Sequence, residues 1–177
     1  MKFTSDWFTI HIPVWEEFLQ KSNSKINILE IGSYEGRSTI WLLNRFPNSL
    51  ITCIDVFQQE KTFDENTKEA KVYGRITKLK GASGEQLKKV NGKFDIIYID
   101  GGHTFQEAMT DLVLSWPLLN INGLLVFDDY SHPRYKCGAA MDVFTSHWDG
   151  VSTLHKDRQV IVRKSKEPLT SVSFLNK

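Results

Sequence analysis

The chain has 177 residues, of which 41% are hydrophobic and 24% charged, and its formal net charge is +1. This length suits one domain with a core of its own, and the charge balance gives no sign of a nucleic-acid partner. No apolar run approaches the roughly 18 residues needed to cross a membrane, and the first residues lack the apolar stretch of a signal peptide. We therefore expect no membrane partner and a cytoplasmic location.

Short apolar runs alternate with helical patterns from residue 26 onward. They predict strands at 26–31, 50–55, 76–79, 94–99 and 123–127, and helices at 37–46, 63–72, 83–90, 104–119 and 134–148. Thr104 with Glu107 would form a capping box, and Ser83 would cap its helix. Strands that alternate with helices favour a parallel sheet covered on both faces.

The two ends of the chain complete this picture. Strands at 151–154 and 159–163 are close enough for a hairpin, which would add one antiparallel edge strand. The sequence thus predicts an α/β fold with a Rossmann-like doubly wound sheet of about seven strands, mostly parallel. We divide the single domain, 1–177, into an N-terminal helical segment (1–24), a core (26–163) and a polar tail (164–177).

A loop with two glycines follows the first strand. Ligands of doubly wound sheets bind at the carboxyl ends of the strands. Gly32 would let a ligand approach the backbone, Gly36 would allow close contact, and the helix that follows would offer free N–H groups to an anion. The Gly-x-x-x-Gly spacing differs from the dinucleotide pattern Gly-x-Gly-x-x-Gly, which disfavours NAD. The alternative is a turn with a structural purpose only.

Acidic residues stand where other strands end. Asp55, about 20 residues beyond the loop, would bind ribose hydroxyls, or else be a solvated strand end. Asp100, Asp128 and Asp129 would converge, because adjacent strands lie ~4.8 Å apart. Such carboxylates favour a hard cation such as Mg²⁺, Mn²⁺ or Ca²⁺, or else cap separate turns. His103 could take a proton near neutral pH, or be an exposed loop histidine.

Several stretches together resemble class I S-adenosylmethionine-dependent methyltransferases over about residues 26–163. Leu29–Thr39 resembles the first motif of the catechol O-methyltransferases, and Gly81–Ser83 resembles their adenine-site turn. Three stretches are more similar to the macrocin-type sugar O-methyltransferases: Tyr98–His103, Val126–Tyr130 and Cys137–Phe144. The resemblance implies S-adenosylmethionine as methyl donor, usually a divalent metal, and a small-molecule acceptor.

Carried over position by position, the resemblance implies residue roles. Glu30, Gly32 and Ser38 would hold the methionine part, and Ser83 would contact the adenine. Tyr34 would lie near the sulfonium, and Asp55 would hold the ribose. Asp100, Asp128 and Asp129 match the metal ligands, and His103 stands where the catechol enzymes place a basic lysine. Gly102 replaces the aromatic residue that shields adenine in those enzymes. The predicted cofactor-binding residues are Glu30, Gly32, Ser33, Tyr34, Gly36, Ser38, Asp55, Val56, Ala82, Ser83 and Asp100.

The sequence therefore predicts metal-assisted methylation of a small-molecule hydroxyl, with His103 and Asp100 as catalytic residues. Two alternatives stay open: a metal-independent methyltransferase acting on another acceptor, and an S-adenosylmethionine-binding module without catalysis. The N-terminal segment could also form a homodimer. Several aromatic residues could line an acceptor pocket, or belong to the core or to a dimer surface: Trp7, Phe8, Trp15, Phe57, Tyr130 and Tyr135.

Overall fold

The computed structural model describes residues 1–166 and contains one seven-stranded sheet in the order β3-β2-β1-β4-β5-β7-β6. The strands are β1 (Asn27–Ile31), β2 (Leu50–Asp55), β3 (Ile76–Lys80), β4 (Phe94–Ile99), β5 (Leu119–Phe127), β6 (Val151–Lys156) and β7 (Val160–Lys164). The first five strands run parallel, and β7 runs antiparallel to both of its neighbours. The predicted fold class is confirmed, with the antiparallel strand β7 one place in from the edge.

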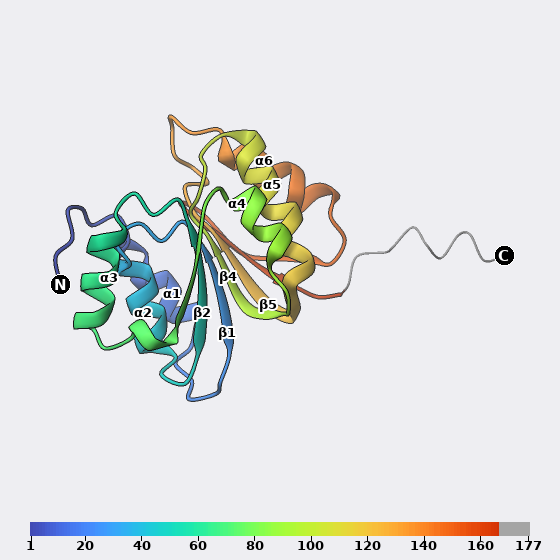
Figure 1. Ribbon diagram of the computed structural model, residues 1–177. Helices are drawn as coiled ribbons and strands as arrows, with labels where there is room; N and C mark the ends of the chain where they lie inside the picture. Colours follow the sequence, from blue (N-terminus) through green and yellow to red (C-terminus); the bar gives the residue numbers. More distant parts are fainter. Residues whose placement is uncertain (167–177) are drawn as a thin grey trace.

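Within residues 1–166, six α-helices cover the two faces of the sheet (Figure 1). They are α1 (Ile12–Phe18), α2 (Arg37–Arg45), α3 (Glu60–Glu69), α4 (Ser83–Gln86), α5 (Phe105–Ser115) and α6 (Cys137–His147). α1, α2 and α3 lie on one face, and α4, α5 and α6 lie on the other. Single 3-10 turns occur at Thr9–His11, Tyr73–Arg75, Leu87–Lys89 and Trp116–Leu118. The sheet and the helices on its two faces thus form a three-layer α/β/α arrangement.

Helix ends differ from the prediction where local chemistry decides them. Thr104 and Glu107 form the predicted capping box at the start of α5. Ser83 is not a cap, because Ala82 holds the N-cap position of α4 and no side chain bonds there. α5 ends at Ser115, and the 3-10 turn that follows contains Pro117, which cannot continue an α-helix.

Each face of the sheet has its own apolar cluster. Trp15, Leu42 and Phe63 are fully buried against one face, and Leu112, Trp116 and Phe144 against the other. Cys53 lies in the first cluster as a buried free thiol. Lys164, which we assigned to the polar tail, is instead the buried last residue of β7, where its ammonium group donates to the carbonyls of Trp116 and Leu119. The rest of the predicted tail, from 167 on, lies outside the described residues.

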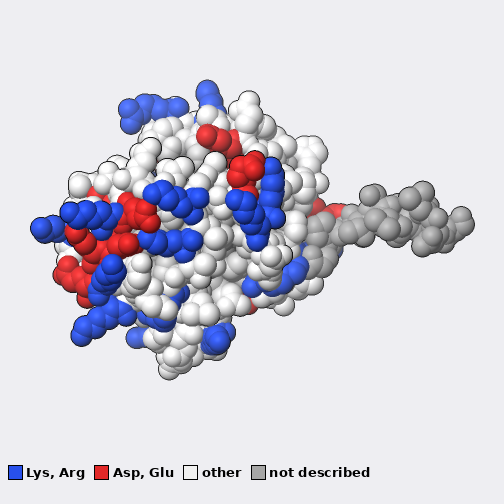
Figure 2. All heavy atoms as spheres, viewed as in Figure 1, with Lys and Arg blue, Asp and Glu red and all other residues white. Residues whose placement is uncertain are grey.

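The charged surface is mixed on the face shown in Figure 2, where acidic and basic side chains gather together over the α3 region. Lys78 pairs there with both Glu60 and Asp64, and Lys80 also pairs with Glu60. Among residues 1–166, no helix is long and apolar enough to cross a membrane.

Candidate active site

A cavity of about 1240 Å³ opens at the carboxyl ends of the parallel strands. Its walls come from the loops after β1, β2, β3, β4 and β5, from the N-terminal segment and from Arg158 between β6 and β7. The loops after β1 and β4 touch directly, because a Cβ on Gly32 would lie 1.9 Å from the carbonyl oxygen of Asp100. Gly32 also has a φ of +86°, so only glycine fits this close crossing without strain.

Asp55 organises the loop after β1. Its Oδ2 accepts hydrogen bonds from the backbone N–H groups of Ser33 (2.7 Å) and Tyr34 (2.9 Å). Its Oδ1 accepts from the backbone N–H of Phe57 at 2.5 Å. Tyr34 and Phe57 have positive φ values of 44° and 53°, a rare conformation for such residues. The Asp55 carboxylate therefore holds two unusual backbone turns in place at the edge of the cavity.

Glu30 lies beneath this loop and not in the cavity wall. It is fully buried and accepts hydrogen bonds from the hydroxyls of Ser33 (2.8 Å), Ser38 (2.5 Å) and Thr39. Burial raises the pKa of the Glu30 carboxyl, whereas these three hydroxyl donors lower it. Because its oxygens are engaged by the chain, Glu30 shapes the loop from below.

The other predicted cofactor residues separate into three groups. The main cavity is lined by Gly32, Tyr34, Asp55, Val56, Ala82, Ser83 and Asp100. A smaller adjoining pocket is lined by Ser33 and Ser38. Gly36 lines neither pocket. It has a φ of +85°, and a Cβ there would lie 3.0 Å from the ring of Phe63. A glycine at this position therefore lets the start of α2 pack closely against α3. Most of the predicted set thus lines one cavity, and one of its members, Asp100, also belongs to the acidic cluster.

The N-terminal segment covers the loop after β1. The backbone N–H and the hydroxyl of Thr4 both donate to the carboxylate of Glu35, each at 2.8 Å. Arg37 donates to the carbonyl of Ser5 at 3.4 Å. The ring of Trp7 lies 5.5 Å from that of Tyr34, and Trp7 remains 71% exposed at the mouth of the cavity. These contacts make the segment part of the site, which periodicity could not show.

Acidic side chains meet at the other end of the cavity. Potential ligand atoms of Asp100, His103 and Asp129 all lie within 4.8 Å of one another. Burial raises the pKa of Asp100 well above its usual range, and the neighbouring charges of Asp128 and Asp129 raise it further. The predicted convergence of Asp100 and Asp129 is therefore present, and His103 joins them.

Tyr98 links two of these carboxylates. Its hydroxyl lies 2.5 Å from Oδ2 of Asp128 and 3.0 Å from Oδ2 of Asp100, and it has one hydrogen to donate. Burial, together with the charges of Asp100 and Asp128, raises the pKa of Tyr98 well above its usual value. Tyr98 thus acts as a hydroxyl donor between two acids. It was predicted only as a strand residue, although its place two residues before Asp100 puts both side chains on one face of β4.

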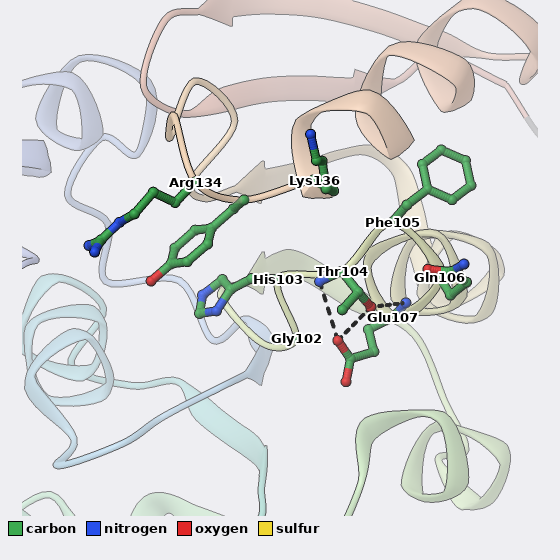
Figure 3. A pocket seen from close by; sticks show the side chains of 9 residues that line it. Gly102, His103, Thr104, Phe105, Gln106, Glu107, Arg134 and Lys136 are labelled. Atoms are coloured by element: carbon green, nitrogen blue, oxygen red, sulfur yellow. Dashed lines mark hydrogen bonds between the residues drawn. The ribbon is translucent and has the colours of Figure 1, made fainter.

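His103 points from the loop after β4 into a neighbouring open pocket (Figure 3). Its Nε2 lies 3.0 Å from Oδ2 of Asp129. Its ring stacks on Tyr135 with centroids 4.0 Å apart, and His132 stacks on Tyr135 at 3.8 Å. The imidazole is therefore oriented by a carboxylate at one edge and by an aromatic ring across its face, while 42% of its side chain stays exposed.

The aromatic residues whose location the sequence leaves undecided are found partly in the cavity wall and partly in the core. Trp7 and Tyr135 line the cavity. Phe8, Trp15 and Phe57 are buried in the core, and the hydroxyl of Tyr130 donates to Asp142. One cavity residue that had no sequence signal is His11, whose Nε2 lies 3.7 Å from Oδ1 of Asp128.

Comparisons with known proteins agree with this geometry. The chain is similar to O-methyltransferase hkm8 of Aspergillus hancockii, with 31% identity over 61% of this chain and 44% of that protein. Its structure is similar to that of an O-methyltransferase from Bacillus cereus in complex with SAH, with a TM-score of 0.73, 17% identity and coverage of 92% and 84% of the two chains. It is also similar to MycE of the mycinamycin pathway, in complex with Mg, SAH and mycinamycin VI, with a TM-score of 0.64, 18% identity and coverage of 92% and 51%.

The structural likenesses support the fold, and the family rests on the sequence. The chain spans only 44–62% of the length of the curated relatives it matches. A family model described as a methyltransferase domain matches residues 29–130, which include the loop after β1, Asp55, the acidic residues and His103. Since this match covers more than half of the chain, the chain belongs to the methyltransferase domain family.

Proposed function

We propose that this chain transfers a methyl group from S-adenosylmethionine to a hydroxyl group of a small molecule, with help from a divalent cation. The observation that carries the proposal is a single cavity lined both by the loops after β1, β2 and β3 (the donor end) and by the cluster of Asp100, Asp129 and His103 (the acidic end). One cavity that joins a donor site to an acidic cluster suits direct transfer between two bound molecules.

The donor end suits S-adenosylmethionine. Asp55 faces the cavity, and backbone N–H groups use three of the roughly four acceptor positions of its carboxylate, so one position on Oδ1 is left for a ribose hydroxyl. The turn at Ala82 and Ser83 offers a site for the adenine beside exposed Val56. Tyr34 lines the same cavity with its ring 5.5 Å from that of Trp7, and we assign it to the sulfonium on the resemblance.

The acidic end suits a hard cation. Burial and the neighbouring charges of Asp128 and Asp129 raise the pKa of Asp100, and a bound cation would relieve this repulsion between carboxylates. Carboxylates of Asp100, Asp128 and Asp129 would hold Mg²⁺, Mn²⁺ or Ca²⁺, which prefer oxygen ligands. A bound cation would lower the pKa of the acceptor hydroxyl.

His103 is the proposed proton acceptor. Its contact with Asp129 and its stacking on Tyr135 fix the ring beside the cluster without burying it. An imidazole held in this way can accept the hydroxyl proton as a general base. Transfer itself then depends on alignment of the oxygen, the methyl carbon and the sulfonium, which the walls of the cavity enforce.

Calorimetric titration with S-adenosylmethionine, with Mg²⁺ and with NAD as a control tests the proposal. We expect S-adenosylmethionine to bind, NAD not to bind, and Mg²⁺ to bind wild type but not Asp129→Ala. Failure to bind S-adenosylmethionine would reject the donor assignment. Methyl transfer that continues in a chelator would reject the cation and favour a metal-independent methyltransferase. Binding of the donor without transfer to any of a set of phenols and sugars would favour a non-catalytic module.

A further inference from the structure

Asp128 is surrounded by donors that come from distant parts of the chain. Its Oδ2 accepts from the hydroxyl of Tyr98 at 2.5 Å and from Nε2 of Gln159 at 2.9 Å. Its Oδ1 accepts from the backbone N–H of Asp129 at 2.7 Å. A carboxylate has about four acceptor positions, two on each oxygen. Oδ2 is therefore fully used, and Oδ1 keeps one acceptor position, with Nε2 of His11 lying 3.7 Å away.

The orientation of the Gln159 amide is decided by Trp15. The indole N–H of Trp15 donates to Oε1 of Gln159 at 2.7 Å, and both residues are buried, with exposures of 0% and 1%. An indole N–H can only donate, so it must face the amide oxygen. The amide NH₂ group must then face Asp128, so Gln159 always donates a hydrogen bond to this carboxylate and never turns its amide oxygen toward it.

Trp15 also supports the second donor to Asp128. Its ring packs edge to face against Tyr98, with centroids 4.8 Å apart and planes at 84°. Phe8 and Trp41 pack against the other edges of the same indole, at 4.8 and 5.4 Å. One buried residue of α1 thus fixes both side chains that occupy Oδ2 of Asp128.

We propose that Trp15 and Gln159 are positioning residues of the active site, which hold the carboxylate of Asp128 in one orientation at the cavity wall, beside Asp100, with which it shares the hydroxyl of Tyr98. This inference rests on the proposed cation-assisted transfer. The inference adds α1 and the turn before β7 to the active site, although neither belongs to the loops that form the donor site. A merely structural role would affect stability, whereas a positioning role must also affect the affinity for the cation.

The test measures binding of Mn²⁺ to the full chain by electron paramagnetic resonance of the free ion. The variants are Trp15→Phe, which removes the indole N–H but keeps an aromatic ring, Gln159→Met, which keeps the length but removes the amide, and the double variant. Trp116→Phe is the matched control, since Trp116 is equally buried and its indole N–H has no partner among residues 1–166. Binding of S-adenosylmethionine is followed in the same samples.

We expect each single variant to weaken Mn²⁺ binding by about tenfold or more, as is usual when a residue that orients a ligand is lost. The double variant should bind Mn²⁺ no more weakly than Gln159→Met, because both changes disrupt the same chain of hydrogen bonds from Trp15 through Gln159 to Asp128. Trp116→Phe should bind Mn²⁺ like wild type, and binding of S-adenosylmethionine should change in none of them.

Two results would overturn the inference. The first is a Trp15→Phe protein that is less stable but binds Mn²⁺ as tightly as wild type, which would make the contact structural only. The second is a wild-type protein that binds S-adenosylmethionine but no Mn²⁺. That result would remove the cation, and with it the positioning role, while leaving the methyl donor in place.

Discussion

Asp111 shows what a single buried carboxylate costs this fold. It lies on α5 directly beneath the cavity, where its Oδ2 would be 3.1 Å from a Cβ on Gly101. Neither of its oxygens has a hydrogen-bond partner among the described residues. Burial raises its pKa to about 6, and the hydroxyl of Ser83 opposes the rise only in part, since it lies outside hydrogen-bonding geometry.

The raised pKa of Asp111 makes stability depend on pH. The folded protein binds this proton more tightly than the unfolded chain, so the free energy of unfolding falls as the pH rises from about 4 to 6. Above pH 6 the full penalty of roughly 3 kcal/mol is present. We expect the free energy of unfolding of Asp111→Asn, measured by urea unfolding, to rise relative to that of wild type by up to this amount between pH 4 and pH 7. Parallel pH profiles for the two proteins would contradict the argument.

At the scale of elements, the strands were predicted within a few residues because buried parallel strands appear as short apolar runs. Thr104 was predicted as a cap from its spacing to Glu107, and it forms the capping box. Links between distant residues could not be predicted. Trp15 and Gln159 lie 144 positions apart, and only the packing of α1 on the sheet brings them together.

The capping box of α5 gives a prediction for stability. The hydroxyl of Thr104 accepts from the backbone N–H of Glu107 at 3.2 Å, and the Glu107 side chain reaches back to the backbone N–H of Thr104 at 3.3 Å. Thr104→Ala should lower the free energy of unfolding by about 1 kcal/mol, or roughly 2–4 °C in Tm.

Thr110→Ala is the matched control on the same helix. The hydroxyl of Thr110 bonds to the carbonyl of Gln106 inside α5, so its loss leaves no helix end unsatisfied. Thermal unfolding followed by circular dichroism should show no loss of stability for this variant. Equal losses in the two variants would mean that the capping box does not stabilise α5.

At the scale of the whole molecule, the donor end and the acidic end of the one cavity are held in place by different side chains. The donor end is held by Asp55 and by backbone groups, and the acidic end by Tyr98 and Gln159. None of the hydrogen bonds of Asp55 involves an acidic residue of the cluster. Binding of S-adenosylmethionine should therefore need no cation, even if methyl transfer does.

Thermal unfolding with saturating ligand tests this independence. A ligand at one hundred times its Kd stabilises the folded state by about 2.7 kcal/mol, which raises Tm by roughly 5–11 °C for a chain of this size. We expect S-adenosylmethionine to give this rise equally in Mg²⁺ and in chelator. Asp129→Ala should show the same rise in Tm, because Asp129 lies at the acidic end. Asp55→Ala should show no rise, because the loop after β1 then loses the carboxylate that accepts from the backbone N–H groups of Ser33 and Tyr34. A rise that vanishes in chelator would mean that the cation also organises the donor end, and the two ends would then act as one site.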